Sequence, residues 1–180
     1  MQNSATDQLD DCVYYRGEEY GELPQISRLM ETVFDEFIAP GYDPHGTREF
    51  LGYIHPAAIA YRIKRNHFLR VATVEETVNE RTTTKIVGVI EVRNHCHISL
   101  LFVAGQFQRR GIASELVRQA IALCQTHNPT LQHVTVHADP RAVPAYEAMG
   151  FYATGTARIE NGIHYIPMVY SLEGDGEMGR

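Results

Sequence analysis

The chain has 180 residues, enough for one domain with a single sizeable core, and 44% of them are hydrophobic while 21% are charged. That balance is typical of a globular protein, and no stretch approaches the roughly 18 uncharged apolar residues that cross a bilayer. The net charge of −6 argues against nucleic acid as a partner and favours cationic ligands.

Hydrophobic periodicity changes once along the chain. Between residues 26 and 63 apolar residues recur at helical spacing, interrupted by the prolines and glycines of residues 39–46. Beyond residue 66, apolar and β-branched residues form three consecutive segments typical of antiparallel strands. In chain order we expect a strand at 12–16, helices at 26–37, 47–54 and 56–63, strands at 67–76, 84–93 and 95–103, a helix from 112 to 124, a strand at 133–138, a helix at 139–150 and a hairpin of 151–159 and 163–172.

Capping and turn residues set the boundaries of these elements. Thr47 is expected to cap the second helix, and Asp139, followed by proline, is expected to open the last one. Pro144 falls inside that last helix, so either its first turn is irregular or the helix begins near Pro144. A polar loop at 77–83 and a tight turn near Asn94 join the three strands. The order predicts an α+β fold of mixed α/β layers, with a central, mostly antiparallel twisted sheet flanked by helices.

Residues 108–113, QRRGIA, stand between an apolar strand and an amphipathic helix. The N-terminus of a helix exposes backbone N–H groups and carries partial positive charge, so it attracts phosphate. Gly111 allows the backbone to approach a ligand closely, and Arg109 and Arg110 add positive charge. An ordinary capped helix with solvated arginines explains these residues equally well, because a glycine at a strand–helix turn is common.

Two spaced motifs resemble the signatures of the GNAT N-acetyltransferase superfamily. Gln108, Gly111 and Ala113 match its Q-x-x-G-x-A acyl-coenzyme A motif. Residues 139–151, DPRAVPAYEAMGF, resemble its second motif, N-x-x-A-x-x-x-Y-x-x-x-G-F, with Asp139 where Asn is commoner. The predicted order of elements is also the one that this family uses, so the resemblance covers nearly the whole chain.

The resemblance implies a single GNAT-like domain at residues 11–172, and the polar ends at 1–10 and 173–180 are expected to fray. It implies that the sheet is splayed between its fourth and fifth strands and that acetyl-CoA lies in the gap. The cofactor's pyrophosphate would meet the backbone of the QRRGIA loop, and the backbone N–H of Val103 would polarise the thioester carbonyl. The residues assigned to the cofactor in this way are Phe102, Val103, Gln108, Arg109, Arg110, Gly111, Ile112, Ala113, Ser114, Asp139, Ala142 and Tyr146.

Tyr146 matches the position of that family's general acid. A phenol with a pKa near ~10 is protonated at neutral pH and can donate a proton to the departing sulfur. Without the motif, a core aromatic that shares a helix face with Ala142 and Met149 is the simpler interpretation. The resemblance favours the catalytic role.

Two residues compete for the role of the base that takes a proton from the acceptor amine. His97 is predicted to share a strand face with Ser99, Leu101 and Val103, on the side of the acetyl group. Glu91 on the preceding strand is the alternative. Each is explained equally well as a partly solvated strand side chain.

The acceptor side is assigned by the resemblance to the first two helices and the loop between them. Their acidic residues either attract a cationic amine or form a solvated helix face, and His164 and Tyr165 of the final hairpin are further candidates. His95 and His97 share a predicted strand face, but a metal would need a third ligand, so no metal is expected. The acidic residues are Glu31, Asp35, Glu36, Asp43 and Glu49.

The resemblance implies an acetyl-CoA-dependent N-acetyltransferase that acts on a primary amine, of a small molecule or a protein, by direct attack in a ternary complex. The alternative is a non-catalytic CoA-binding module of the same fold. Neither nucleic acid nor a membrane is expected as a partner, while strand edges in the final hairpin offer a surface for a homodimer. The three scattered cysteines and the polar N-terminal segment predict a cytoplasmic location.

Overall fold

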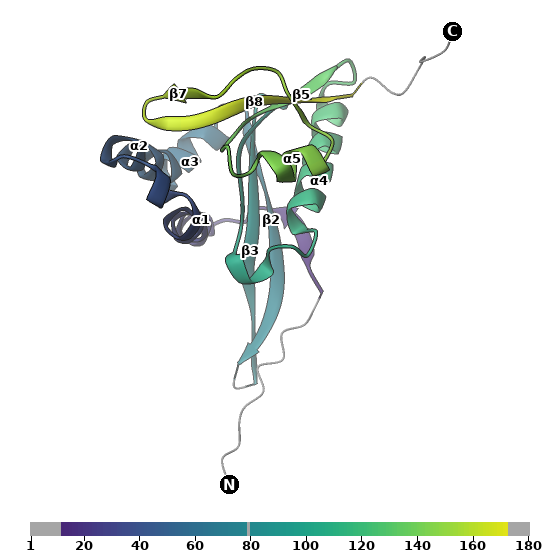
Figure 1. Cartoon of the computed structure of the whole chain (residues 1–180). Helices are drawn as coiled ribbons and strands as arrows, with labels where there is room; N and C mark the ends of the chain where they lie inside the picture. The colour runs from purple at the N-terminus through teal and green to yellow at the C-terminus, as the bar shows by residue number, and fades with distance from the viewer. Residues whose placement is uncertain (1–11, 79, 173–180) are drawn as a thin grey trace.

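An eight-stranded twisted sheet separates two groups of helices (Figure 1). The computed structural model describes residues 12–78 and 80–172, so the expected frayed termini lie outside the described residues. The strand order is β1-β2-β3-β4-β5-β8-β6, with β7 also paired to β8. The strands are β1 (Tyr14–Gly17), β2 (His67–Val78), β3 (Arg81–Arg93), β4 (His97–Val103), β5 (His133–Ala138), β6 (Tyr152–Ala153), β7 (Arg158–Glu160) and β8 (Ile163–Ser171).

Each face of the sheet is covered by its own helices (Figure 1). Apolar residues of α1, spaced as predicted, pack with α2, α3 and one face of the sheet, while α4 covers the other face together with α5. None of the helices in the described part of the chain has the length and apolar character that a membrane span requires. The helices are α1 (Leu23–Phe37), α2 (Pro44–Ile54), α3 (Pro56–Ile63), α4 (Ile112–His127) and α5 (Val143–Ala148), with single 3-10 turns η1 (Ala39–Gly41) and η2 (Gly105–Phe107).

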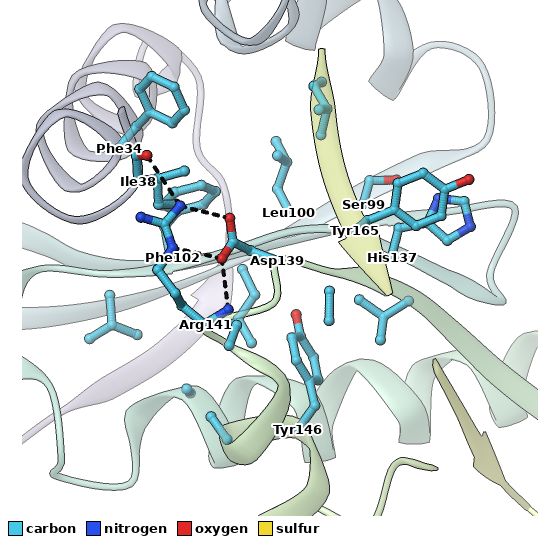
Figure 2. A pocket seen from close by; sticks show the side chains of 18 of the residues that line it. Phe34, Ile38, Ser99, Leu100, Phe102, His137, Asp139, Arg141, Tyr146 and Tyr165 are labelled. Carbon is cyan, nitrogen blue, oxygen red and sulfur yellow. Dashed lines mark hydrogen bonds and ion pairs between the residues drawn. The ribbon is translucent and has the colours of Figure 1, made fainter. Parts of the chain in front are cut away.

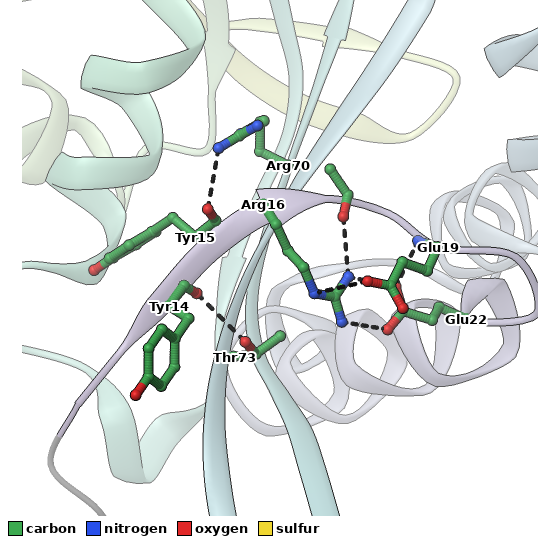
Figure 3. Close-up of polar contacts among 8 residues, drawn as sticks. Tyr14, Tyr15, Arg16, Glu19, Glu22, Arg70 and Thr73 are labelled. Carbon is green, nitrogen blue, oxygen red and sulfur yellow. Dashed lines mark hydrogen bonds and ion pairs between the residues drawn. The ribbon is translucent and has the colours of Figure 1, made fainter.

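Polar contacts fasten β1 and the start of α1 to each other (Figure 3). The Arg16 guanidinium donates to both carboxylate oxygens of Glu22, at 2.9 and 2.6 Å, and Glu22 also accepts the backbone N–H of Glu19 at 2.7 Å. From β2, Arg70 donates to the carbonyl of Tyr15 at 3.2 Å. These contacts hold the N-terminal end of α1, the helix whose other end reaches the functional cleft.

The sheet opens between β4 and β5, as predicted. These two strands are parallel, in contrast to the antiparallel pairs elsewhere among the described strands, and they pair only at His97 with Thr135 and Ile98 with Val136. Beyond that point β4 continues to Val103 and β5 to Ala138 without pairing to each other, while each stays paired to its outer neighbour. Diverging strands leave backbone groups of β4 directed at the gap, where a ligand can pair with them.

A β-bulge in β4 changes the alternation of its side chains. Glu91 of β3 pairs with Leu100, whereas the next residue, Val92, pairs with Ile98. Ser99 is therefore an extra residue in β4 without a counterpart in β3. One inserted residue shifts the two-residue alternation, so residues before the bulge lie on the opposite face from the one that regular alternation predicts from the residues after it.

The bulge corrects the expected position of His97. Because paired residues of antiparallel strands share a face, His97 lies on the α1–α3 face with Leu100, while Leu101 and Val103 lie on the α4 face. The prediction that His97, Ser99, Leu101 and Val103 share one face was wrong. Simple alternation cannot reveal an inserted residue.

Two helices, α2 and α5, also begin differently from the prediction because their capping residues act differently. Helix α2 begins at Pro44, and its cap is Asp43 instead of Thr47, because an oxygen of Asp43 accepts the N–H of Gly46 at 2.7 Å. Helix α5 begins only at Val143, since Asp139 accepts the N–H of Arg141 at 2.9 Å and forms a turn before the helix. Of the two readings of Pro144, the later start is the one observed.

Three strand boundaries were wrong. The predicted loop at 77–83 is largely strand, because the threonines that begin β3 pair with the end of β2. The predicted strand at 151–159 is two short strands, β6 and β7, separated by residues 154–157. His95 lies in the β3–β4 turn with a φ of 53°, outside β4, and therefore does not share a strand face with His97.

Candidate active site

A cleft of about 1300 Å³ opens where β4 and β5 separate. One end is formed by β4, the segment that follows it and the start of α4, and α5 forms part of the wall. The other end is formed by the C-terminal part of α1, by α2 and by the β7–β8 hairpin. Figure 2 shows side chains from these elements converging on one cavity.

The loop between β4 and α4 is shaped by its backbone. Gly111 has a φ of 80° and Arg109 a φ of 62°, so the chain turns sharply before the helix begins. The side-chain amide of Gln108 donates to the carbonyl of Val103 at 3.0 Å, which fixes the loop on the end of β4. The first helical bond runs from Glu115 N–H to Gly111 at 3.0 Å, so the preceding N–H groups have no intrahelical acceptor.

Most of the residues predicted for the cofactor line this cleft. Arg109 lines it, but Arg110 lies outside the lining, with its guanidinium 5.3 Å from the centre of the Phe107 ring. The N–H groups of the first turn of α4, beside Arg109, form a site suited to phosphate. The predicted cofactor residues that line the cleft are Phe102, Val103, Gln108, Arg109, Gly111, Ile112, Ala113, Ser114, Asp139, Ala142 and Tyr146.

The edge of β4 that faces the gap carries backbone donors. The N–H of Ala104 donates to Val87 of β3 at 2.9 Å, and backbone groups alternate in direction along a strand. The N–H of Val103 is therefore directed to the gap. The same alternation directs the N–H of Leu101 to the gap, deeper in the cleft, and sequence analysis did not identify this residue because any side chain can supply a backbone donor.

Tyr146 comes from α5 and is only 6% exposed. Its ring packs edge-on against Phe151 at 5.3 Å, and its hydroxyl points into the cleft (Figure 2). Burial raises the pKa of Tyr146 well above its ordinary value, because the phenolate would lose its hydration. The side chain is thus both part of the core and a protonated donor at the cleft.

His97 and His137 lie together at the point where the strands separate. Nδ1 of His97 is 2.7 Å from the hydroxyl of Thr135, and the His137 ring contacts His97 edge-on at 4.9 Å and stacks on Tyr165 at 4.1 Å. Burial, with the charge of Arg93 next in size, lowers the pKa of His97 to about 4, so this imidazole is neutral at pH 7. The pKa of the more exposed His137 is also lowered, mainly by burial.

Sequence analysis missed His137. The available signal was its place at the end of the strand that borders the predicted gap.

Glu91 lies away from the cleft. Its side chain is fully buried and accepts from Arg62 at 2.7 and 2.8 Å, while Nδ1 of His67 lies 2.7 Å away. Arg62 also donates to the carbonyl of Tyr53 at 2.6 Å. Glu91 therefore fastens α3 to the sheet and is not positioned to deprotonate an acceptor in the cleft.

His95 and His97, predicted to share a strand face, have different neighbours in the structure. The ring of His95 stacks on His127 with centroids 3.5 Å apart, whereas His97 faces Thr135 and His137. Within residues 12–78 and 80–172, no three histidine, cysteine or acidic side chains are grouped closely enough to hold a metal ion.

The end of the cleft predicted for the acceptor is rich in aromatic rings. Among the acidic residues predicted there, Glu49 lines the cleft, and Asp43 instead caps α2. Glu160 of β7 adds a second carboxylate, 3.3 Å from the hydroxyl of Tyr165. Tyr42, Tyr53, His164 and Tyr165 complete this end of the lining.

A family model described as an acetyltransferase (GNAT) domain matches residues 38–172. No protein of curated function matches the chain in sequence. Many solved structures share the fold. One is the PaiA N-acetyltransferase from Thermoplasma acidophilum in complex with coenzyme A, with a TM-score of 0.70, 11% identity and alignment of 89% of this chain and 99% of that one.

The names of two other solved structures with this fold state an acceptor. The ribosomal-protein-S18-alanine N-acetyltransferase from Escherichia coli has a TM-score of 0.59 and 15% identity, with 94% of this chain and 99% of that one aligned. A spermidine N-acetyltransferase SpeG chimera from Vibrio cholerae and hSSAT has a TM-score of 0.57 and 18% identity, with 88% and 95% aligned. At these identities the similarity establishes the shared fold.

Proposed function

Because the chain belongs to the GNAT acetyltransferase family, we propose that it transfers the acetyl group of acetyl-CoA to a primary amine, with both substrates bound in the cleft at once. One observation carries this proposal above the others. The buried side chain of Tyr146 points its hydroxyl into a cleft that has a helix N-terminus suited to phosphate at one end and an aromatic, partly acidic pocket at the other.

The cofactor end fits acetyl-CoA, which supplies an acetyl group activated as a thioester. The N–H groups at the start of α4 and the Arg109 guanidinium would bind the pyrophosphate. The N–H groups of Leu101 and Val103, directed to the gap, are the candidate donors to the thioester oxygen, where negative charge develops during attack.

Two proton transfers accompany the reaction. The acceptor arrives as an ammonium, with a pKa near ~10.4 for an alkylamine, and must lose a proton before it can attack. His97 is neutral at pH 7 and is our candidate to take that proton, directly or through water, although the burial that keeps it neutral also makes it a weak base. His137 lies beside it and is the second candidate. Tyr146 is held protonated by burial and would donate to the departing sulfur.

The acceptor is a primary amine on a small molecule or a protein. The names of the similar structures include a polyamine and a protein alanine, so the fold accommodates both kinds. Glu49 and Glu160 in the lining favour a cationic acceptor over an anionic one.

Replacing Tyr146 with phenylalanine tests the proposal. The ring and its packing remain, but the proton donor is lost, so we expect turnover to fall by about 10²–10⁴-fold. The melting temperature should stay within a few degrees of the parent and acetyl-CoA affinity should be unchanged, because the volume is conserved. Tyr152→Phe, an exposed tyrosine outside the cleft lining, is the matched control. Parental turnover in Tyr146→Phe would leave Tyr146 as a packing residue and return the non-catalytic CoA-binding module to consideration.

A further inference from the structure

Arg141 spans the two walls of the cleft. Its guanidinium donates to the carbonyl oxygens of Phe37 at 2.7 Å and Ile38 at 3.1 Å, residues more than one hundred positions earlier in the chain. The same guanidinium is held by Asp139, with Nε–Oδ1 at 2.9 Å and Nη2–Oδ2 at 3.0 Å. Dashed lines in Figure 2 mark the contacts of Arg141 with Ile38 and Asp139. We call Asp139, Arg141 and the two carbonyls the cross-cleft bridge.

The cross-cleft bridge provides hydrogen-bond donors for the carbonyl groups at the C-terminal end of α1. The last carbonyls of a helix have no intrahelical partners and carry partial negative charge, so a cation stabilises them. The last turn of α1, all of which is described, contains no basic residue, and Arg141 supplies the cation from the other wall. Gly41, just after the end of α1, lies beside the Arg141 side chain. A Cβ added to Gly41 would be 3.5 Å from the guanidinium nitrogens.

Each end of the bridge leads directly into the lining. On one side Ile38 and Tyr42 line the acceptor end of the cleft. On the other side Asp139 and Ala142 line the wall that continues into α5, the helix that carries Tyr146. The bridge therefore fixes the distance between the acceptor wall and the proposed proton donor.

A second contact holds the far end of the same acceptor segment. A Cβ built on Gly46 would lie 2.5 Å from the carbonyl oxygen of Gly162 in the β7–β8 turn, so the two backbones touch. Between the two attachments, the ring of Tyr42 packs near His164 at 6.1 Å. Residues 38–46 are thus held at both ends, and removing one attachment frees only one end.

We propose that Arg141 is a positioning residue for the acceptor: through the cross-cleft bridge it holds residues 38–42 against the wall that carries Tyr146. This role rests on the proposed acetyl transfer. Arg141 makes no contact with the helix N-terminus assigned to the pyrophosphate, so its loss should affect the acceptor and leave cofactor affinity nearly intact. This role also explains why residue 139 is aspartate where the family motif more often has asparagine: a carboxylate can bind a guanidinium through both of its oxygens.

Steady-state kinetics with two amine probes, spermidine and a peptide with an N-terminal alanine, test the proposal. With the better probe, Arg141→Ala should raise the KM for the amine by about tenfold, the loss expected for one or two exposed charge-assisted hydrogen bonds. The acetyl-CoA dissociation constant from calorimetry should change by less than about twofold. Asp139→Asn should raise the KM by a smaller factor, because it keeps the turn and loses the charge. Arg141→Lys should recover part of the loss.

Amide hydrogen exchange supplies a readout that does not depend on activity. In Arg141→Ala the amides of residues 38–42 should exchange about tenfold faster, while those of β3 keep their parental rates. Arg118→Ala removes another exposed arginine–carboxylate pair, with Glu115 on α4, away from the cleft lining, and is the control for both measurements.

The outcomes separate the two proposals. An unchanged amine KM in Arg141→Ala, or parental exchange at residues 38–42, would overturn the role of Arg141. A KM increase equal to that of Arg118→Ala would also overturn it. If the parent releases no thiol with any amine, the proposed function fails, and exchange at residues 38–42 still decides whether the bridge holds this wall.

Discussion

The two ends of the cleft are built in opposite ways. The end of the cleft proposed for the cofactor comes mainly from one continuous stretch, residues 101–114, with Asp139, Ala142 and Tyr146 on the adjoining wall, and offers mainly backbone N–H groups of a strand edge and a helix start. The acceptor end is assembled from α1, α2, the β5–α5 loop and the β7–β8 hairpin, and offers side chains held by contacts between distant residues.

This difference shows which kind of site a short sequence motif can predict and which kind it cannot. A backbone cradle needs a glycine with positive φ and a helix start, both of which lie within a few residues of sequence. A pocket of side chains depends on how remote segments meet, and its residue types are free to vary with the acceptor. The cofactor end should therefore fail through local changes, and the acceptor end through changes at its attachments.

The largest effect is expected at Gly111, in the cofactor end. Gly111→Asp places a negative charge beside the helix N-terminus that would bind pyrophosphate, so calorimetry should detect no acetyl-CoA binding. Gly111→Asn is the matched control, because asparagine has the same size, tolerates positive φ and is uncharged. It should retain measurable affinity. If a folded Gly111→Asp binds acetyl-CoA like the parent, the cradle lies elsewhere.

A smaller effect is expected at Gly46, in the acceptor end. Gly46→Ala would force the start of α2 away from the β7–β8 turn, because the new methyl group would collide with the Gly162 carbonyl. We expect a loss of about 1–3 kcal/mol in the free energy of unfolding, with an increased amine KM and unchanged acetyl-CoA affinity. Gly52→Ala in the same helix has open space around it and should be neutral or stabilising. Equal behaviour of the two variants would contradict this packing.

The smallest expected effect is on the pH dependence of stability. It concerns His97, which lies between the two ends of the cleft. His97 has a pKa of about 4 in the folded protein and near ~6.5 when unfolded, so the unfolded chain binds the extra proton between these values. Stability should therefore fall as the pH drops from about 6.5 towards 4. His97→Gln should reduce the difference in unfolding free energy between about pH 7.5 and about pH 5.8 by about 1 kcal/mol. Urea unfolding at the two pH values measures it, and an unchanged difference would mean that His97 titrates normally.

The sequence predicted the fold, and it predicted the glycine turn and helix start that line the end of the cleft proposed for the cofactor, because these signals are local. QRRGIA lies where an apolar strand meets a helix, and the resemblance of its motif to the GNAT signature implied a sheet that opens between its fourth and fifth strands. The strand face of His97 was mispredicted, because the bulge at Ser99 leaves no mark in the alternation of residue types. The contact between Arg141 and the end of α1 was also out of reach, since it joins residues more than one hundred positions apart.

Thiol release from acetyl-CoA over a panel of primary amines tests most directly whether the two ends of this cleft serve one reaction. The panel should include polyamines, amino acids and peptides with free N-termini, with each product checked by mass spectrometry. We predict amine-dependent release of CoA in step with acetylated product for at least one cationic amine. Tight binding of acetyl-CoA without amine-dependent release across the panel would contradict this and identify a CoA-binding module that does not catalyse transfer.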